Sequence, residues 1–245
     1  MTKTALMELI DRPESPMVRG HGSYLWDERG RRYLDFVQGW AVNCLGHNPE
    51  VITRAIETQL LRVTNVGPAY HNQPASELAQ RLAGASGLER VFFLCTGADA
   101  NEGALKLARK WGQKQRGGAH EVIVTQESFH GRTLALMSAS GKPGFDTRFP
   151  PAVPGFRKVP FGDAAAVEAA IDDATVAVMV EPIQGEAGVV LPDASYLHAL
   201  RTICERRGVL LILDEVQTGM ARTGPLFACQ AHGVTPDIMT LGKGL

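Results

Sequence analysis

The chain has 245 residues, of which 44% are hydrophobic, and its 25 basic and 26 acidic residues give a net charge of -1. This length and apolar content are enough for one large α/β domain with a sizeable core, and they exclude a disordered or fibrous protein. The balanced charge provides no basic surface, so we expect neither nucleic acid nor a membrane as a partner.

The four cysteines form no C-x-x-C pair and stand in or beside apolar runs. This pattern predicts reduced core thiols and no metal site. The amino terminus lacks a long apolar segment, and no run of about 18 apolar residues occurs anywhere, so the chain is predicted to be cytoplasmic. The sequence contains neither G-x-G-x-x-G nor a P-loop, which counts against a nicotinamide enzyme.

The amino-terminal part is predicted to contain a short helix, an arm and a hairpin. Residues 1 to about 20 indicate a short helix followed by an arm that Pro13 and Pro16 break. Residues 23–36 read as two strands around a turn that ends in a glycine, which predicts a hairpin. The segment 39–47 is irregular, and its Trp40 either lines a pocket or packs in the core.

Two helices are predicted next, one that begins at Pro49 and runs to Leu60 and one over residues 74–82. Residues 90–95 have the composition of a strand, and a small-residue turn and a helix over 99–114 follow at once. Backbone N–H groups at a helix start can bind an anion, so Thr96, Gly97 and Ala98 are a candidate phosphate site. The alternative is that Thr96 or Asp99 is only a helix cap.

Residues 121–126 predict the next strand, and aromatic and basic side chains follow it. Phe129 is suited to stack on a planar ring and Arg132 to bind a carboxylate, although core packing and a structural ion pair are the alternatives. The proline-rich segment 141–160 is interpreted as a long surface excursion. A helix over 163–173, a buried strand over 175–180 and a crossover helix over 192–208 complete this region, with Glu186 in the loop after the strand.

Two apolar runs, 209–213 and 238–241, are predicted to be buried strands of a parallel sheet. Since ligands bind at the carboxyl ends of such strands, Asp214 and Gln217 are placed at a site, and the second run brings Lys243 to the same edge. An aspartate and a lysine there suit a Schiff-base cofactor such as pyridoxal phosphate (PLP). Taken alone, each of the two is also compatible with a solvated strand end or turn.

The alternation of strands and helices, with polar residues after nearly every strand, predicts the α/β class with a mainly parallel sheet and helices on both faces. On its motifs, the chain resembles the class III (ornithine and acetylornithine type) aminotransferases of PLP fold type I. The similar blocks occur in the family's order: the hairpin YLWDERGRRYLDF, then AVNCLGH, TGADANEGALKLAR, SFHGRT, VEPIQGE, LDEVQTG and TLGKG.

The resemblance implies a PLP-binding large domain over residues 51–245, incomplete at its C-terminal end, and an arm and hairpin segment of the small domain over residues 1–50. It implies that Lys243 forms the Schiff base and transfers the substrate proton, and that Asp214 pairs with the ring nitrogen. The other implied roles are phosphate binding by Thr96, Gly97 and Ala98, ring contacts by Phe129, Val216 and Gln217, and substrate binding by Arg132 and Glu186.

The implied reaction moves an amino group from N-acetylornithine to 2-oxoglutarate, in a full-length protein expected to be a homodimer. Another ω-amino-acid aminotransferase, an aminomutase, and a non-catalytic remnant that binds PLP or a partner remain alternatives. The family continues well beyond the Schiff-base lysine into a C-terminal small domain, whereas this sequence ends two residues after Lys243. We therefore expect either a fragment or a truncated gene product, whose site would be incomplete.

Overall fold

A computed structural model describes residues 5–245 of the chain. The chain divides into two compact units, residues 1–67 and 68–245. No helix within residues 5–245 is long and apolar enough to cross a membrane.

The first unit is built on a three-stranded antiparallel sheet with the order β1-β2-β3. The strands are β1 (Met17–His21), β2 (Tyr24–Asp27) and β3 (Arg32–Leu34). The turn between β2 and β3 is stabilised by the buried Asp27 carboxylate, which accepts the N–H groups of Arg29 and Arg31 at 3.0 and 2.9 Å. Gly30 adopts the left-handed φ of 76° that this turn needs. The predicted hairpin is confirmed.

Two helices follow in this unit, α1 (Gln38–Ala41) and α2 (Glu50–Leu60). The helix predicted from Pro49 is confirmed, with Pro49 at its N-cap. Trp40 is 53% exposed, so of the two alternatives for this residue core packing is wrong. The predicted amino-terminal helix is also wrong for residues 5–16, which contain none, while residues 1–4 lie outside the described part. Residues 17–21 instead pair with β2, a long-range partner that local propensity does not reveal.

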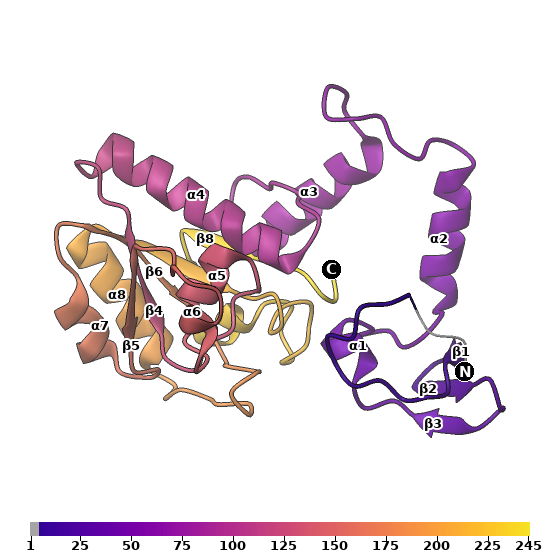
Figure 1. Cartoon of the computed structure of the whole chain (residues 1–245). Helices are drawn as coiled ribbons and strands as arrows, with labels where there is room; N and C mark the ends of the chain where they lie inside the picture. The colour runs from indigo at the N-terminus through magenta and orange to yellow at the C-terminus, as the bar shows by residue number, and fades with distance from the viewer. Residues whose placement is uncertain (1–4) are drawn as a thin grey trace. The chain divides into compact units, whose positions relative to one another are not determined.

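The second unit contains a five-stranded parallel sheet with the order β5-β4-β6-β7-β8 (Figure 1). The strands are β4 (Glu121–Thr125), β5 (Phe156–Val159), β6 (Thr175–Val180), β7 (Leu210–Asp214) and β8 (Ile238–Thr240). All six residues of β6 are buried, as expected for a central strand covered on both faces. The predicted α/β class with a parallel sheet is confirmed.

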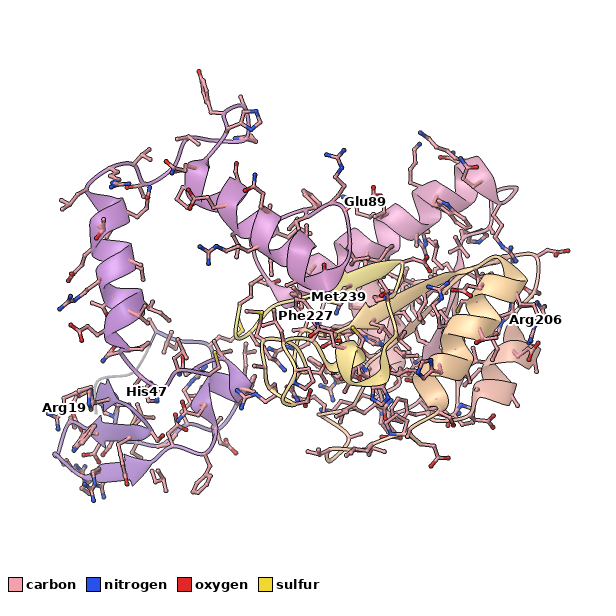
Figure 2. All side chains as sticks on the ribbon, turned by 180° about the vertical axis from the view of Figure 1, so that it is seen from behind. Arg19, His47, Glu89, Arg206, Phe227 and Met239 are labelled. Carbon is pink, nitrogen blue, oxygen red and sulfur yellow. The ribbon has the colours of Figure 1, made fainter. Side chains whose placement is uncertain are left out.

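Helices cover both faces of this sheet. Helices α4 and α5 pack with Val122, Val124 and Ile212, while α7 and α8 pack with Ile123 and Leu211 on the opposite face. Phe227 belongs to the cluster of α7 and α8, and Met239, the middle residue of β8, packs against that cluster; Figure 2 labels both residues. The helices are α3 (Gln73–Ser86), α4 (Gly97–Gln115), α5 (Leu134–Ala139), α6 (Phe145–Arg148), α7 (Ala164–Ala170), α8 (Tyr196–Arg207) and the short 3-10 helix η1 (Ala228–His232).

The predicted strand over residues 90–95 is wrong, because these residues form no strand. A cleft of about 1090 Å³ is lined by this segment on one side and by β8 on the other. Phe92 is 76% exposed, and the neighbouring Phe93 and Leu94 are 40% and 41% exposed. The strand-like composition therefore has no neighbouring backbone to pair with among the described residues.

The interpretation of 141–160 as a surface excursion is wrong as well, since the segment contains α6 and β5. β5 is an edge strand with Arg157 and Lys158 at its centre, and charged edge strands have a weak apolar signal. Lys158 Nζ lies 3.1 Å from a carboxylate oxygen of Asp146. Of the predicted core thiols, Cys204 and Cys229 are buried and Cys44 and Cys95 are exposed.

Candidate active site

The ends of β7 and β8 bring two of the predicted site residues to one edge of the sheet. Asp214 is the last residue of β7 and pairs in register with Thr240, the last residue of β8. Both strands are parallel, so their carboxyl ends meet, and Lys243 follows β8 after a short turn. The structure thus places Asp214 and Lys243 where the strand pattern predicts them.

Lys243 lies in a tight, half-buried turn. Its backbone has a left-handed φ of 46°, which is uncommon for a residue with a side chain. Burial lowers the pKa of the Lys243 ammonium, and the negative charges of Asp214, Glu186 and Glu181 only partly offset this effect. Its Nζ donates a hydrogen bond to Oε1 of Gln217.

Gln217 is fixed from a second direction by the loop after β6. A Cβ atom at Gly185 would collide with Nε2 of Gln217, so a larger residue at position 185 would force the Gln217 side chain to shift. The amide of Gln217 therefore lies between the β6 loop and the lysine.

The start of α4 lies against the same strand ends. Thr96 is the N-cap of α4, and its hydroxyl oxygen accepts the Asp99 N–H at 3.0 Å. A Cβ atom at Gly97 would lie 2.6 Å from Val216, and one at Gly242 would lie 3.2 Å from the Gly97 Cα. The first N–H groups of α4 are thus next to the lysine turn, in the positive end of a 19-residue helix. The cap role of Thr96 and anion binding by the helix start are compatible.

The loop that carries Phe129 and Arg132 packs on the first turn of α4. A Cβ atom at Gly131 would lie 3.0 Å from the Cβ of Ala98, and Gly131 has a φ of 136°. Phe129 is half-buried, with its ring edge against Phe145 at 6.1 Å between centroids. Arg132 is exposed on this loop.

Asp214 is the centre of a buried polar network that includes residues the sequence analysis missed. Its Oδ2 accepts hydrogen bonds from Nδ1 of His130 and from Nδ2 of Asn101, both at 2.8 Å. The sequence does contain a signal that Asn101 is buried, since it shares one helix face with the apolar Ala104, Leu105 and Ala108, which are buried. His130 has no comparable signal beyond its place next to Phe129.

Glu181 is a second buried carboxylate at this edge. It stands directly after β6, and its Oε2 accepts the Phe129 N–H at 2.9 Å. Burial raises the pKa of Glu181 to about 7, and the charge of Asp214 adds to this, while the charges of His130 and Lys243 act against it. Asp214, Glu181 and Lys243 are thus close enough to influence one another electrostatically.

Glu186 lies farther along the loop after β6, and its Oε2 is 3.3 Å from Nζ of Lys142. Both side chains are more than a third exposed, at 36% and 40%. The same Nζ lies 5.8 Å from the centre of the Phe129 ring. Lys142 therefore lies between Glu186, which is predicted to bind the substrate, and Phe129, which is predicted to contact the cofactor ring.

The arrangement combines the elements of Schiff-base chemistry. A half-buried amine, a buried carboxylate with several donors and a glycine-lined helix start lie within one unit. Within residues 5–245, no group of three His, Cys, Asp or Glu side chains is placed to hold a metal ion.

Comparison with known proteins gives consistent similarities. Residues 10–245 match the family described as aminotransferase class-III. Acetylornithine aminotransferase 2 of Bordetella bronchiseptica is 56% identical over 241 residues, which cover 98% of this chain and 61% of the relative. The chain thus spans about three fifths of the length of the curated relatives it matches.

Solved structures show the same similarity in three dimensions. The ornithine aminotransferase of Toxoplasma gondii superposes with a TM-score of 0.93 at 35% identity, over 98% of this chain and 57% of that chain. The N-acetylornithine aminotransferase of Stenotrophomonas maltophilia gives a TM-score of 0.82 at 36% identity, over 95% of this chain and 59% of that chain. The fold of this chain is that of these enzymes over the shared part.

Proposed function

Because the chain belongs to the class-III aminotransferases, we propose that the protein is a PLP-dependent transaminase that moves an amino group from N-acetylornithine to 2-oxoglutarate. The observation that carries this proposal is the meeting of Asp214 and Lys243 at one sheet edge beside the start of α4. The similarity to acetylornithine aminotransferases supports the choice of the donor.

Class III aminotransferases depend on PLP, and the residues of this chain fit that cofactor. The start of α4 offers N–H donors for a phosphate, and glycines at 97 and 242 let the turns after β7 and β8 approach it closely. Asp214 offers a buried carboxylate for a protonated ring nitrogen, and Lys243 offers an amine for an aldehyde. The further residues proposed to hold the ring are Phe129, Val216 and Gln217, with Thr96 and Ala98 at the phosphate.

When bound, PLP supplies an aldehyde that condenses with amines and a protonated ring that withdraws electrons from the substrate carbon. Lys243 is the proposed nucleophile and proton carrier, because its lowered pKa increases the fraction of neutral amine. The neutral amine can take a proton from the substrate carbon and return one. Gln217 holds Nζ of Lys243 in place, and Asp214 would accept the hydrogen of a protonated ring nitrogen.

Substrate binding is assigned to two charged residues on loops at this edge. Arg132 is proposed to bind the substrate carboxylate through its planar guanidinium. Glu186 is proposed to distinguish the amino donor from the dicarboxylate acceptor, since its negative charge repels a second carboxylate. All residues with a proposed role lie in the large domain predicted over residues 51–245.

We further infer that the protein acts in the cytoplasm and as a homodimer. Both statements rest on what membership of the class-III aminotransferases implies. Light scattering on the purified protein tests the dimer.

The decisive experiment adds PLP to the purified protein, records the visible absorption band of bound cofactor, and then adds one amino donor at a time. We expect the band to form and to disappear with N-acetyl-L-ornithine faster than with L-ornithine or 4-aminobutyrate. Glutamate should then form after 2-oxoglutarate is added. A chain that binds PLP but reacts with no donor would be a non-catalytic PLP-binding protein.

A second candidate is an ornithine transaminase, favoured by the similarity to the Toxoplasma gondii enzyme. The same donor series separates the two, because faster loss of the band with L-ornithine would support this candidate. A preference for 4-aminobutyrate would indicate another ω-amino-acid enzyme of the class. Since the relatives are longer, a negative result is repeated on a longer form of the protein before the proposal is abandoned.

A further inference from the structure

One oxygen of the Asp214 carboxylate is held by two buried side chains. Nδ1 of His130 and Nδ2 of Asn101 each lie 2.8 Å from Oδ2. The exposed fractions of His130, Asn101 and Asp214 are 2%, 1% and 4%. Oδ1 accepts the Val216 N–H at 3.1 Å and the Thr240 hydroxyl only at 3.5 Å. The strong side-chain donors are thus on Oδ2, whereas one of the two acceptor sites of Oδ1 is held only by the long hydrogen bond from Thr240.

Asn101 joins three elements through one amide group. Its Nδ2 donates to Asp214 Oδ2 and also to the carbonyl oxygen of His130, at 2.7 Å. The orientation of the amide follows from chemistry, because the flipped amide would direct its oxygen at two acceptors. Asn101 on α4 therefore fixes both the backbone that carries His130 and the carboxylate that His130 contacts.

The protonation of His130 follows from its partner. An ionised carboxylate only accepts hydrogen bonds, so Nδ1 of His130 carries the hydrogen. Burial of the ring lowers the pKa of His130, but the hydrogen bond and charge of Asp214, together with the charge of Glu181, outweigh this, so the net direction is upward. Asp214 from the end of β7 and Glu181 from the end of β6 are the titratable groups that act on the ring.

Packing alone does not account for this network. Nε2 of His130 and Oδ1 of Asn101 are buried and have no hydrogen-bond partner within residues 5–245. An unpaired buried polar atom destabilises the fold, and apolar residues of the same shape would avoid that cost. Apolar residues cannot supply the pair of donors that holds the Asp214 carboxylate in one orientation.

We propose that His130 and Asn101 are positioning residues that orient the Asp214 carboxylate through Oδ2, so that its less strongly held oxygen, Oδ1, faces a protonated ring nitrogen. The identity of the ring rests on the proposed function. The contacts among His130, Asn101 and Asp214 do not, and they are measurable without cofactor.

The test compares two substitutions of His130. His130→Asn keeps an N–H donor near the position of Nδ1 but has no titratable ring. His130→Phe keeps the shape of the ring and removes the donor. We expect His130→Phe to weaken PLP binding about tenfold or more, as loss of a hydrogen bond to a charged group does, and to move the pH at which the visible band changes. His130→Asn should stay within about threefold of wild type.

Equal loss in both folded variants would overturn the proposal, because the donor would then not matter. Unchanged binding and an unchanged pH profile in His130→Phe would overturn it too. If His130→Phe does not fold, Asn101→Leu takes its place as the variant that removes a donor from Oδ2. The same tenfold loss and shifted profile are expected there, and wild-type behaviour contradicts the proposal.

A measurement without PLP separates this proposal from the proposed function. In the wild-type protein labelled with nitrogen-15 in histidine, the His130 resonance should show a hydrogen on Nδ1, and Asp214→Asn should shift it. No response to Asp214→Asn would show that the contact does not exist. A normal response in a protein that fails to bind PLP would leave the contact in place and contradict only the proposed function.

Discussion

Lys243 Nζ donates a hydrogen bond to Oε1 of Gln217, and this contact joins the turn after β8 to the turn after β7. The lysine makes the contact from a left-handed backbone conformation, with a φ of 46°. Such a conformation costs a residue with a side chain about 1–2 kcal/mol. The backbone is thus strained at Lys243, the residue to which the chemistry is assigned, and backbone strain of this kind is common at functional sites.

The first prediction concerns this strain. Lys243→Ala and Lys243→Gly should both abolish the visible band of bound PLP, since neither supplies an amine. Lys243→Gly should be more stable than Lys243→Ala by about 1 kcal/mol, because only glycine adopts this φ freely. Urea denaturation without cofactor measures the difference. At Lys158, in the middle of β5, the alanine variant should instead be the more stable of the two. If the glycine variant is the more stable at both positions, backbone strain at Lys243 is not the cause.

The second prediction concerns the contact between the start of α4 and the turn after β7. Gly97→Ala would place a Cβ atom 2.6 Å from Val216, so we expect a loss of about 1–3 kcal/mol in the free energy of unfolding. Gly84→Ala is the matched control. Gly84 lies inside α3 with nothing within 4 Å, and alanine there should stabilise by about 0.5–1 kcal/mol.

Val216→Ala provides an internal check on that contact. In combination with Gly97→Ala it removes the colliding methyl groups, so the two substitutions together should cost less than the sum of their separate effects. Simple additivity would show that the helix start moves away from Val216 instead.

The sequence allowed the prediction that Asp214 and Lys243 meet at one edge of the sheet, because the signals for both strand ends are local. The run before Asp214 has no alternation of apolar and polar residues, which identifies a strand covered on both faces, and Lys243 follows a run of the same kind. Parallel pairing then brings the two ends together without further information.

The parts of the site that the sequence did not predict depend on contacts between distant segments. The hydrogen bonds of Asp214 to Asn101 and His130 span 113 and 84 positions in the chain, so no local pattern reports them. Residues 90–95 show the opposite case. Their composition is that of a strand, yet a strand exists only when a neighbouring backbone pairs with it.

The third prediction concerns Lys142, which neutralises Glu186 in the structure at 3.3 Å. Lys142→Met should change stability by less than about 1 kcal/mol, because both partners are partly exposed. It leaves the charge of Glu186 uncompensated, so KM for 2-oxoglutarate should rise severalfold while kcat changes little. Lys158→Met breaks the ion pair with Asp146 and is the matched control, with no expected change in KM. Equal effects of the two substitutions would remove Glu186 from the proposed substrate site.

The fourth prediction concerns pH and the buried Glu181, whose pKa burial raises from 4.5 to about 7. Between these two values the folded protein binds more protons at this group than the unfolded chain does. The stability that protonated Glu181 contributes is therefore fully present below about pH 4.5 and is lost as pH rises to about 7.

Glutamine at 181 can still accept the Phe129 N–H but does not ionise. Glu181→Gln should therefore become more stable than wild type as pH rises through this window, by an amount of the order of 1–3 kcal/mol at the upper end. Urea denaturation at several pH values without cofactor measures the difference. The charge of Lys243 lowers the pKa of Glu181, so in a Lys243→Met background the upper end of the window should move to higher pH. A difference between Glu181→Gln and wild type that is constant from about pH 5 to about pH 8 would show that the carboxylate at 181 ionises without hindrance in the folded protein.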